Sequence, residues 1–316
     1  MLKNSQDIFL LVDGHALIYR AYHAFPPLSD LNGQLVNALY GFLRVLLSTI
    51  KDLSPKYVAV TFDHPSPPKR KQAYALYKAN RKEMPADLQP QIALIQDAVS
   101  KLGMPVFQEA GEEADDLIGT ITKTTSQLPD LYTLILTGDR DTFQLVDQNV
   151  NVYLSQIGLG KKNGGSSTPT IIDEAAVLAK TGVTPAQIID LKALSGDSSD
   201  NIPGVFGVGA VSATKLLQNY GTLDKIYDLV DKGGDENLLK GRLLDKLQAG
   251  KKEAYLSRDL ATIDRGVKLN FNCQACELSN YDKDIASVLL QKYGFNSLLK
   301  MLPADEFEAG VQAELF

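Results

Sequence analysis

Cysteine and histidine are scarce in this chain of 316 residues, which contains two cysteines and three histidines. Cys273 and Cys276 form a lone C-x-x-C, with no second pair and no histidine nearby. A structural zinc site needs four such ligands. We therefore interpret the two cysteines as incidental thiols and expect no zinc site around them.

Long apolar runs are also lacking. No segment reaches the length that spans a membrane, and no basic stretch followed by an apolar leader opens the chain. Hydrophobic residues make up 44% and charged residues 22% of the sequence, as in ordinary soluble proteins. We expect a cytoplasmic protein of about two domains that makes no membrane contact.

A positive net charge is lacking too, since the formal charge is −6. This sign argues against a nucleic-acid partner at first sight. However, we argue below that nine of the acids share one pocket, and without them the rest of the chain carries a small positive excess. The total charge is therefore a poor guide to the partner.

Three short apolar runs are present, and each ends on an aspartate. They lead into Asp13, into Asp63 and into Asp139, with Asp141 two residues further on. Short apolar runs separated by helical stretches are typical of buried parallel strands. Ligands of such sheets bind at the carboxyl ends of the strands. We therefore expect these carboxylates to gather at one edge of a sheet.

The order of the segments predicts an α/β fold. Residues 8 to about 155 alternate strand-like and helix-like stretches, which indicates a mostly parallel sheet flanked by helices, PIN-like or Rossmann-like. From about residue 173 helices dominate, which predicts a second, mainly helical domain. The expected domains are 1–172 with an arch at 64–90, 173–303, and an acidic flexible tail at 304–316. The expected helices span 37–51, 88–102, 114–125, 173–180, 184–195, 210–220, 222–231, 236–249, 251–262 and 282–301.

Two further acidic motifs join the strand-end aspartates, one opening a helix at 111–116 and one in a loop at 195–201. Taken singly, each acid has a structural explanation as a helix cap, a solvated first turn or an Asx-turn. Taken together, nine like charges in one pocket would raise one another's pKa and need bound cations. All-oxygen ligands suit Mg²⁺ or Mn²⁺, and nine carboxylates suit two ions about 4 Å apart. The predicted ligands are Asp13, Asp63, Glu113, Asp115, Asp116, Asp139, Asp141, Asp197 and Asp200.

The segment 69–82 carries six cations and no acid. At helical spacing one stripe holds two arginines and two tyrosines, and a neighbouring stripe holds three lysines. Cations interleaved with aromatic rings suit single-stranded nucleic acid, although a solvated helix with inward tyrosines has the same pattern. The position after Asp63 favours the functional interpretation, in which Lys78 and Arg81 stabilise charge on a reacting phosphate. The stripes are Arg70, Tyr74, Tyr77 and Arg81, and Lys71, Lys78 and Lys82.

A glycine-rich hairpin at 202–209 lies between two predicted helices. Gly204, Gly207 and Gly209 let the backbone approach a phosphate, and the last of them opens the following helix. A helix, a glycine hairpin and a second helix form a unit suited to holding a DNA backbone without reading its sequence. Lys215 on the second helix would add a charge contact.

Six ordered motifs resemble those of the 5′-nuclease (flap endonuclease-like) family, most of all the 5′→3′ exonuclease domain of bacterial DNA polymerase I. The resemblance covers roughly residues 7–302. The motifs read LLVDGHALIYRAY, VTFD, YKANR, GEEADD, LTGDRD and SGDSSDNIPGVFGVG.

This resemblance implies a two-metal site and a role for each motif. One ion would be held mainly by Asp13, Asp63, Glu113 and Asp115, and the other mainly by Asp139, Asp141, Asp197 and Asp200. Lys78 and Arg81 match the cations of the family's arch, and the LLVDGHALIYRAY motif makes Arg20 and Tyr22 candidate DNA contacts. The region near 184–220 would form a helix–three-turn–helix motif, with a K⁺ ion on carbonyls of the 202–209 hairpin.

Two departures from the family pattern concern the grip on DNA. Lys69 stands where the family often has an aromatic residue, and Ala210 and Val211 stand where it often has a lysine. The grip on duplex DNA would therefore be weaker or depend on Lys215.

We expect a monomeric, structure-specific 5′ nuclease that acts on DNA with 5′ single-strand/duplex junctions in replication and repair, including the removal of RNA primers or flaps. The alternatives are a non-catalytic DNA-binding accessory protein of the same fold and a ribonuclease on a similar core. The final residues Gln312–Phe316 resemble the peptide that docks bacterial replication proteins on the sliding clamp, which is a candidate partner. A chance match to so short a motif is the competing explanation.

Overall fold

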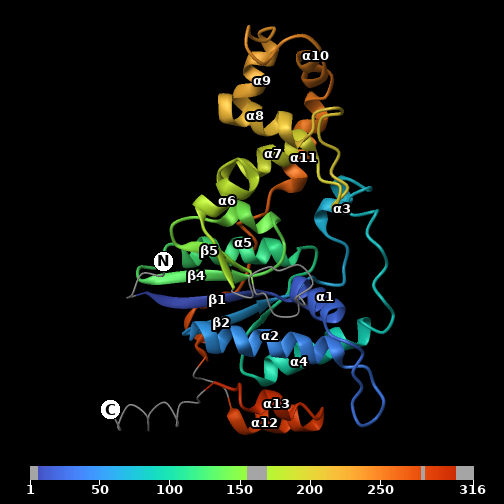
Figure 1. The fold of residues 1–316 in the computed structure, drawn as a ribbon, viewed down its shortest axis with the longest axis vertical. Coiled ribbons are helices and arrows are strands. Elements are labelled where there is room, and N and C mark those ends of the chain that lie inside the picture. Colours follow the sequence, from blue (N-terminus) through green and yellow to red (C-terminus); the bar gives the residue numbers. More distant parts are fainter. Residues whose placement is uncertain (1–5, 155–168, 279–281, 304–316) are drawn as a thin grey trace.

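The computed structural model describes residues 6–154, 169–278 and 282–303. A sheet occupies the middle of the molecule, a helical region lies at one end, and two short helices lie at the other (Figure 1). The glycine-rich stretch 156–168 and the predicted tail 304–316, with Gln312–Phe316, lie wholly outside the described residues. No helix among the described residues has the length and apolar character needed to cross a membrane.

The sheet has six strands in the order β3-β2-β1-β4-β5-β6. All neighbours pair in parallel except β5 and β6, which pair antiparallel. The predicted mostly parallel sheet is therefore confirmed. The strands are β1 (Asp7–Asp13), β2 (Tyr57–Thr61), β3 (Val106–Phe107), β4 (Leu131–Leu136), β5 (Val150–Leu154) and β6 (Thr170–Ile172).

Helices cover both faces of the sheet, which is why its central strands read as continuous apolar runs. In β1, Phe9 and Leu11 belong to the core on one face, and Leu10 and Val12 belong to the core on the other. This alternation follows from the two-residue period of a strand. The second of these cores contains α1 (Gly14–Ala24), α2 (Asn37–Leu53) and α4 (Gln89–Lys101), and α5 (Ala114–Thr125) lies on the first.

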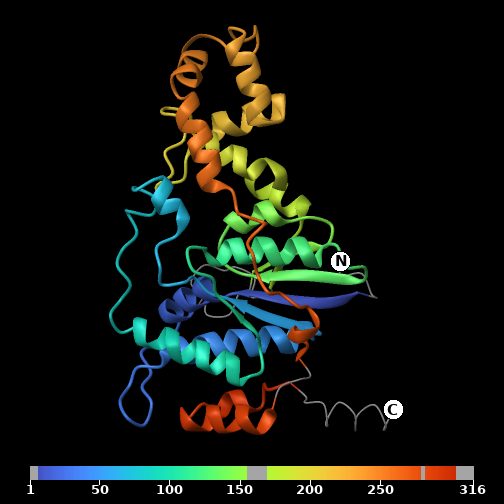
Figure 2. The same cartoon turned by 180° about the vertical axis from the view of Figure 1, so that it is seen from behind.

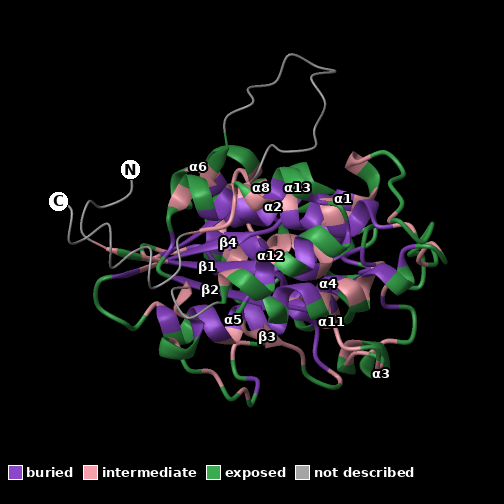
Figure 3. Ribbon diagram, turned by 90° about the horizontal axis from the view of Figure 1, so that it is seen from below, coloured by how far each residue is buried: buried purple, intermediate pink, exposed green. Residues whose placement is uncertain are grey.

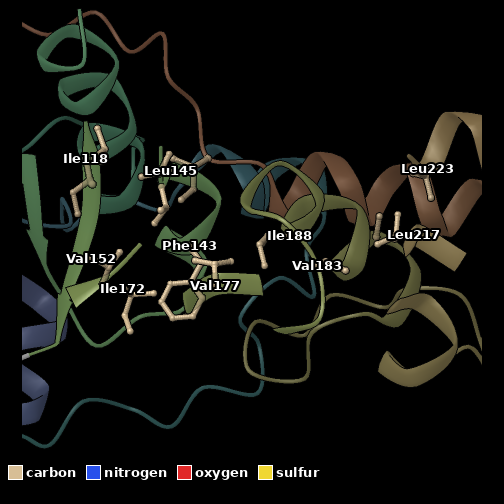
Figure 4. Packing of buried hydrophobic residues seen from close by; sticks show 14 of the residues in the cluster. Ile118, Phe143, Leu145, Val152, Ile172, Val177, Val183, Ile188, Leu217 and Leu223 are labelled. Carbon is tan, nitrogen blue, oxygen red and sulfur yellow. The ribbon is translucent and has the colours of Figure 1, made fainter. Parts of the chain in front are cut away.

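The helical region extends from the α5 side of the sheet without a break in its apolar core. Figure 4 shows this core running from Ile118 and Val152 near the sheet through Val183 to Leu217. Buried residues are accordingly concentrated in the strands and on the inner sides of the surrounding helices (Figure 3). The elements are η1 (Asp141–Leu145), α6 (Glu174–Thr181), η2 (Pro185–Gln187), α7 (Ile188–Ser195), α8 (Ala210–Tyr220), α9 (Leu223–Asp231), α10 (Gly241–Ala249) and α11 (Lys251–Ala261).

The end of the chain returns to the sheet. After α11 it passes η3 (Gln274–Cys276) and pairs with the start of β2, where Leu278 N donates to Lys56 O at 2.9 Å. The helices α12 (Lys283–Lys292) and α13 (Asn296–Leu299) then pack in the core of α2 and α4, far from the helical region (Figures 1 and 2). The prediction of one helix over 282–301 is wrong, because the chain turns at Gly294 with φ +72°. The helical region that packs together therefore ends at α11 rather than at residue 303.

The prediction of a helix over 69–82 is also wrong beyond its first turns. The helix α3 (Lys69–Ala73) ends at Tyr74, whose backbone is extended, and the chain continues in turns with Lys78 at φ +55°. The backbone N–H of Lys78 donates to Asp200 O at 2.9 Å, so a contact across the fold replaces the helical hydrogen bond. The arch, here residues 64–90, joins β2 to α4 and runs beside the helical region (Figure 2).

Candidate metal and nucleic-acid site

Carboxylates meet at the carboxyl ends of the central strands β1, β2 and β4. Asp13 ends β1, accepts a hydrogen bond from Ala16 N at 3.0 Å as the cap of α1, and accepts another from the Thr137 hydroxyl at 2.7 Å. Asp63 follows β2 and accepts from Ala114 N at 2.8 Å, at the first residue of α5. Asp13 thus links the end of β1 to the residue after β4, and Asp63 links the end of β2 to the start of α5. Asp13 is a helix cap as well as a predicted ligand.

These carboxylates lie close enough to repel one another. Burial raises the pKa of Asp13 to about 7, against the hydrogen bonds from Ala16 and Thr137, and the charges of Asp63 and Asp139 add to the rise. Burial also raises the pKa of Asp115 well above its ordinary value, followed by the charges of Asp139 and Asp13. Such mutual repulsion is what a bound cation would relieve.

The remaining predicted ligands are paired with the chain's own cations. The Arg70 guanidinium donates to both oxygens of Asp116 at 2.7 Å and to Glu113 at 2.7 Å. Asp200 accepts from Arg81 at 2.6 Å. Lys78 donates to Glu113 and lies 3.6 Å from Asp200. Five of the nine acids are thus neutralised internally once Lys192 is counted.

Lys192, which the sequence reasoning missed, lies on α7 and donates to both Asp141 and Asp197, the latter at 2.5 Å. Burial alone would raise the pKa of Asp197, but hydrogen bonds from Lys192 and Ser199 lower it to about 2. In Asp141, burial and the charge of Asp139 outweigh Lys192 and raise the pKa to about 6. The sequence contained one signal that could have identified Lys192, namely a cation in the last helical turn before the acidic loop at 195–201.

The donor chemistry, carboxylate oxygens alone, fits a hard divalent cation. Within the described residues, Asp13, Asp63, Asp115 and Asp139 form no ion pair with a lysine or arginine. No three Asp, Glu, His or Cys side chains of the described chain converge closely enough to enclose a metal ion. Five of the nine predicted ligands are held by the chain's own cations instead. We call the other four carboxylates the unpaired quartet. Of the nine predicted ligands, they are the ones that no lysine or arginine of the described chain occupies, so they are the most available to a cation.

The arch places its basic and aromatic residues against this site rather than along a helical stripe. Tyr77 is buried and its hydroxyl donates to Glu113 at 3.1 Å and to Asp200 at 3.3 Å. Tyr74 packs against the small cluster around Tyr77 and Ile202. By contrast, Lys71 and Lys82 are exposed and lie outside these contacts. The tyrosines therefore follow the inward alternative, while Lys78 and Arg81 reach the acids as predicted.

A cleft of about 860 Å³ opens beside the paired acids. Arg20, on α1, lines this cleft, whereas Tyr22 donates its hydroxyl to Asp87 at 2.9 Å in the returning part of the arch. The structure thus brings Arg20 to the site and directs Tyr22 elsewhere. The charged and polar residues that line the cleft are Arg20, Arg81, Asp139, Arg140, Asp141, Lys192, Asp197, Ser198, Ser199 and Asp200.

The 202–209 hairpin is held tightly at its base. Gly204 has φ +63° and packs so closely that a Cβ would lie 2.1 Å from Gly196 N, so only glycine fits. Its backbone N–H donates to the Ser257 hydroxyl of α11 at 2.9 Å. Gly207 has φ +75°, and Gly209 is the N-cap of α8 without a side-chain cap.

The cations near this hairpin come from two helices. Lys215 is exposed on α8, as the sequence suggested. Lys246, which the sequence reasoning missed, reaches over from α10 and donates to Gly207 O at 2.8 Å. Because Lys246 lies 39 residues away, no local motif in the sequence connects it with the hairpin. The hairpin therefore has a neighbouring positive charge despite Ala210 and Val211.

Comparison with known families matches two consecutive parts of the chain. The family described as 5′-3′ exonuclease, N-terminal resolvase-like domain, matches residues 8–182, and the family described as 5′-3′ exonuclease, C-terminal SAM fold, matches residues 183–284. DNA polymerase I of Caldicellulosiruptor bescii is 39% identical over 94% of this chain. DNA polymerase I of Bacillus subtilis is 33% identical over 95% of it. The matches span 34% and 33% of the polymerases, so the chain covers about a third of their length.

Solved structures show the same fold at lower identity. The T5 D15 protein, co-crystallised with metal ions, has a TM-score of 0.63 at 22% identity and covers 93% of this chain and 99% of its own. The catalytic core of Rad2 in complex with a DNA substrate has a TM-score of 0.57 at 18% identity, covering 93% and 90% of the two chains.

Proposed function

The chain belongs to the 5′–3′ exonuclease family, and from this premise we propose that it hydrolyses DNA phosphodiesters near the junction of a 5′ single strand and a duplex. One observation carries the proposal. Beside a cleft that both cations and acids line, three members of the unpaired quartet end or follow adjacent strands and Asp115 lies in the first turn of α5, all without a lysine or arginine partner among the described residues. Such a set attracts divalent cations and, with them, a phosphate.

The residues that would hold two Mg²⁺ or Mn²⁺ ions follow from the two groups of acids. Asp13, Asp63, Glu113 and Asp115 would serve mainly one ion, and Asp139, Asp141, Asp197 and Asp200 mainly the other. When bound, the ions supply a nucleophilic water and neutralise charge at the reacting phosphate. Asp116 stands apart, because it is buried and held by both guanidinium nitrogens of Arg70. Its contribution would be to orient Glu113 at the start of α5.

Two cations of the arch would act on the reacting phosphate. Lys78 is mostly buried, and burial lowers its pKa. The charges of Glu113 and Asp200 outweigh this effect, so the pKa of Lys78 is raised overall and the ammonium stays protonated. Arg81 is about half exposed and is bound to a single acid, Asp200. A DNA phosphate can take the place of these carboxylates as an equivalent anionic partner. Both cations would then stabilise the charge that develops at the phosphate.

The duplex would be held at the other side of the cleft by the 202–209 hairpin and Lys215. At Gly209 a Cβ would meet no atom within 4 Å, so the bare backbone there lets a phosphate approach closely. A K⁺ ion on the hairpin carbonyls is part of this proposal. The proposal also includes docking of Gln312–Phe316 on the sliding clamp. It further includes a monomeric state and a cytoplasmic location at the nucleoid.

Cleavage mapping on labelled 5′-flap, nicked and single-stranded substrates tests the proposal. With Mg²⁺ the flap should be cut near the junction, and EDTA should abolish cutting. The Asp139→Asn variant should bind the flap with nearly normal affinity and leave it uncut. An intact flap after incubation of the wild-type chain with Mg²⁺ or Mn²⁺ would instead support a DNA-binding accessory protein. Comparing the cleavage of matched RNA and DNA flaps distinguishes the proposed DNA nuclease from the ribonuclease alternative.

A further inference from the structure

The hairpin at 202–209 exposes a large apolar side chain on its surface. Phe206 is 94% exposed, more than any other large hydrophobic residue of the described chain. Val211, in the first turn of α8, is 73% exposed. An isolated exposed side chain needs no explanation, but a phenylalanine exposed to this degree offers apolar surface that a partner stabilises by covering it.

The hairpin backbone fixes Phe206 in this outward position. On either side of it Val205 and Val208 are 2% and 3% exposed, so both neighbours are anchored in the core. Val205 N donates to Leu194 O at 2.9 Å, and Val208 N donates to Val205 O at 3.0 Å. Because both neighbours are held, Phe206 cannot fold back onto the protein without breaking the turn.

The surroundings of Phe206 match a nucleic acid rather than an apolar protein partner. The carbonyl oxygen of the next residue, Gly207, accepts a hydrogen bond from Lys246. The Lys246 ammonium therefore lies at the turn that carries Phe206. A Cβ at Gly207 would lie only 2.8 Å from this ammonium, which shows how closely the cation is packed. DNA-binding proteins combine cations on the phosphates with apolar wedges against sugars and base steps in the minor groove.

We propose that Phe206 contacts the minor-groove edge of duplex DNA while Lys246 binds a flanking phosphate, so that an apolar contact and a cation from α10 replace the charge missing at Ala210 and Val211. This inference rests on the proposed function, because it assumes that the hairpin faces the duplex. It adds a side chain of the hairpin, Phe206, and a cation from outside it, Lys246, to the glycines and Lys215.

Fluorescence anisotropy with a labelled 5′-flap duplex tests the inference, with Ca²⁺ replacing Mg²⁺ so that no cleavage occurs. Phe206→Ala should raise the Kd roughly tenfold, which is the size of one covered aromatic contact. The slope of log K against log salt should stay unchanged, because no charge is removed. Lys246→Gln should reduce that slope by about one. Val288→Ala removes an exposed apolar side chain on α12, at the opposite end, and should leave both quantities unchanged.

The outcomes separate this inference from the proposed function. If the wild-type chain binds the flap but Phe206→Ala binds within twofold of it, the Phe206 contact is overturned and the proposed function stands. A wild-type dimer in analytical ultracentrifugation that Phe206→Ala dissociates would also overturn it, by identifying a second copy as the partner. If the wild-type chain binds no junction DNA, both proposals fall.

Discussion

The sharpest prediction concerns Arg70, which the sequence places among the DNA contacts and the structure places inside an ion-pair network. Its side chain is only 15% exposed, and its partners Asp116 and Glu113 are 2% and 9% exposed. A further hydrogen bond at 2.5 Å reaches Thr262 O, so Arg70 joins the arch, α5 and the end of α11. We predict that Arg70 stabilises the fold and does not contact DNA.

The expected loss of stability follows from the charges left behind. Arg70→Ala leaves the buried Asp116 carboxylate without a cation, whereas Glu113 keeps Lys78. Breaking a buried pair in this way costs about 3–5 kcal/mol. Asp116 keeps its hydrogen bonds from Glu113 N at 3.2 Å and Asp264 N at 2.8 Å, which favours the lower end, about 3 kcal/mol. Arg70→Lys keeps the charge but not the planar fork, so its loss should lie between wild type and Arg70→Ala.

Urea unfolding of the metal-free chain at pH 7 measures this loss. The matched control is Lys101→Ala, which removes one exposed ion pair with Asp97, in which the side chains are 45% and 48% exposed. Exposed pairs contribute only about 0–1 kcal/mol, so this variant should unfold almost like wild type. A loss below about 1 kcal/mol in Arg70→Ala, together with a tenfold weaker affinity for flap DNA, would refute the structural role and restore the DNA contact.

Three further predictions concern the carboxylates and their cations. Lys192→Met removes the ammonium between Asp141 and Asp197, so Mn²⁺ should bind several-fold more tightly without DNA in isothermal titration calorimetry, and equal or weaker binding would contradict this competition. Lys78→Ala should lower the single-turnover cleavage rate more than the DNA affinity, because Lys78 lies at the acids; a pure loss of affinity at a normal rate would contradict it. Metal affinity should rise between pH 6 and 8 with release of protons, because the raised pKa values of Asp13, about 7, and Asp141, about 6, keep protons that a cation must displace. A metal affinity that does not change with pH would contradict this prediction. For the same reason these two acids favour the metal-free fold most below about pH 4, and this contribution to stability is lost as the pH rises through 6 to 7.

The sequence was sufficient to predict that Asp13, Asp63 and Asp139 lie at one edge of the sheet. Strand signals that end on Asp13, Asp63 and Asp139 required only that the strands be parallel and adjacent, and the sheet places β1 between β2 and β4. The helix over 114–125 was predicted at its actual bounds because an acidic first turn precedes an amphipathic pattern. These signals are local in the chain, which explains why they sufficed.

The contacts made across the fold could not be predicted in this way. The helical pattern of 69–82 fails because Tyr77 and Lys78 are anchored by Glu113 and Asp200, which lie far away in the sequence. Lys192 and Lys246 gain their roles only from the packing of α7 and α10. Gly294 is a different case, since a glycine within a helical pattern is a local signal of an end that the prediction of 282–301 overlooked.

The ion pairs also explain how so many acids coexist in one pocket of the folded chain. Arg70, Lys78, Arg81 and Lys192 each lie against one or two carboxylates, so only the unpaired quartet is left to repel itself. Two of these cations belong to turns of the arch, whose position therefore depends on Glu113 and Asp200. These are acids that the motifs at 111–116 and 195–201 would contribute to the metal site. A phosphate that binds Lys78 and Arg81 would release those acids toward a cation. The predictions for Lys78 and Lys192 consequently share one cause, namely that each lysine occupies a carboxylate which a divalent ion also needs.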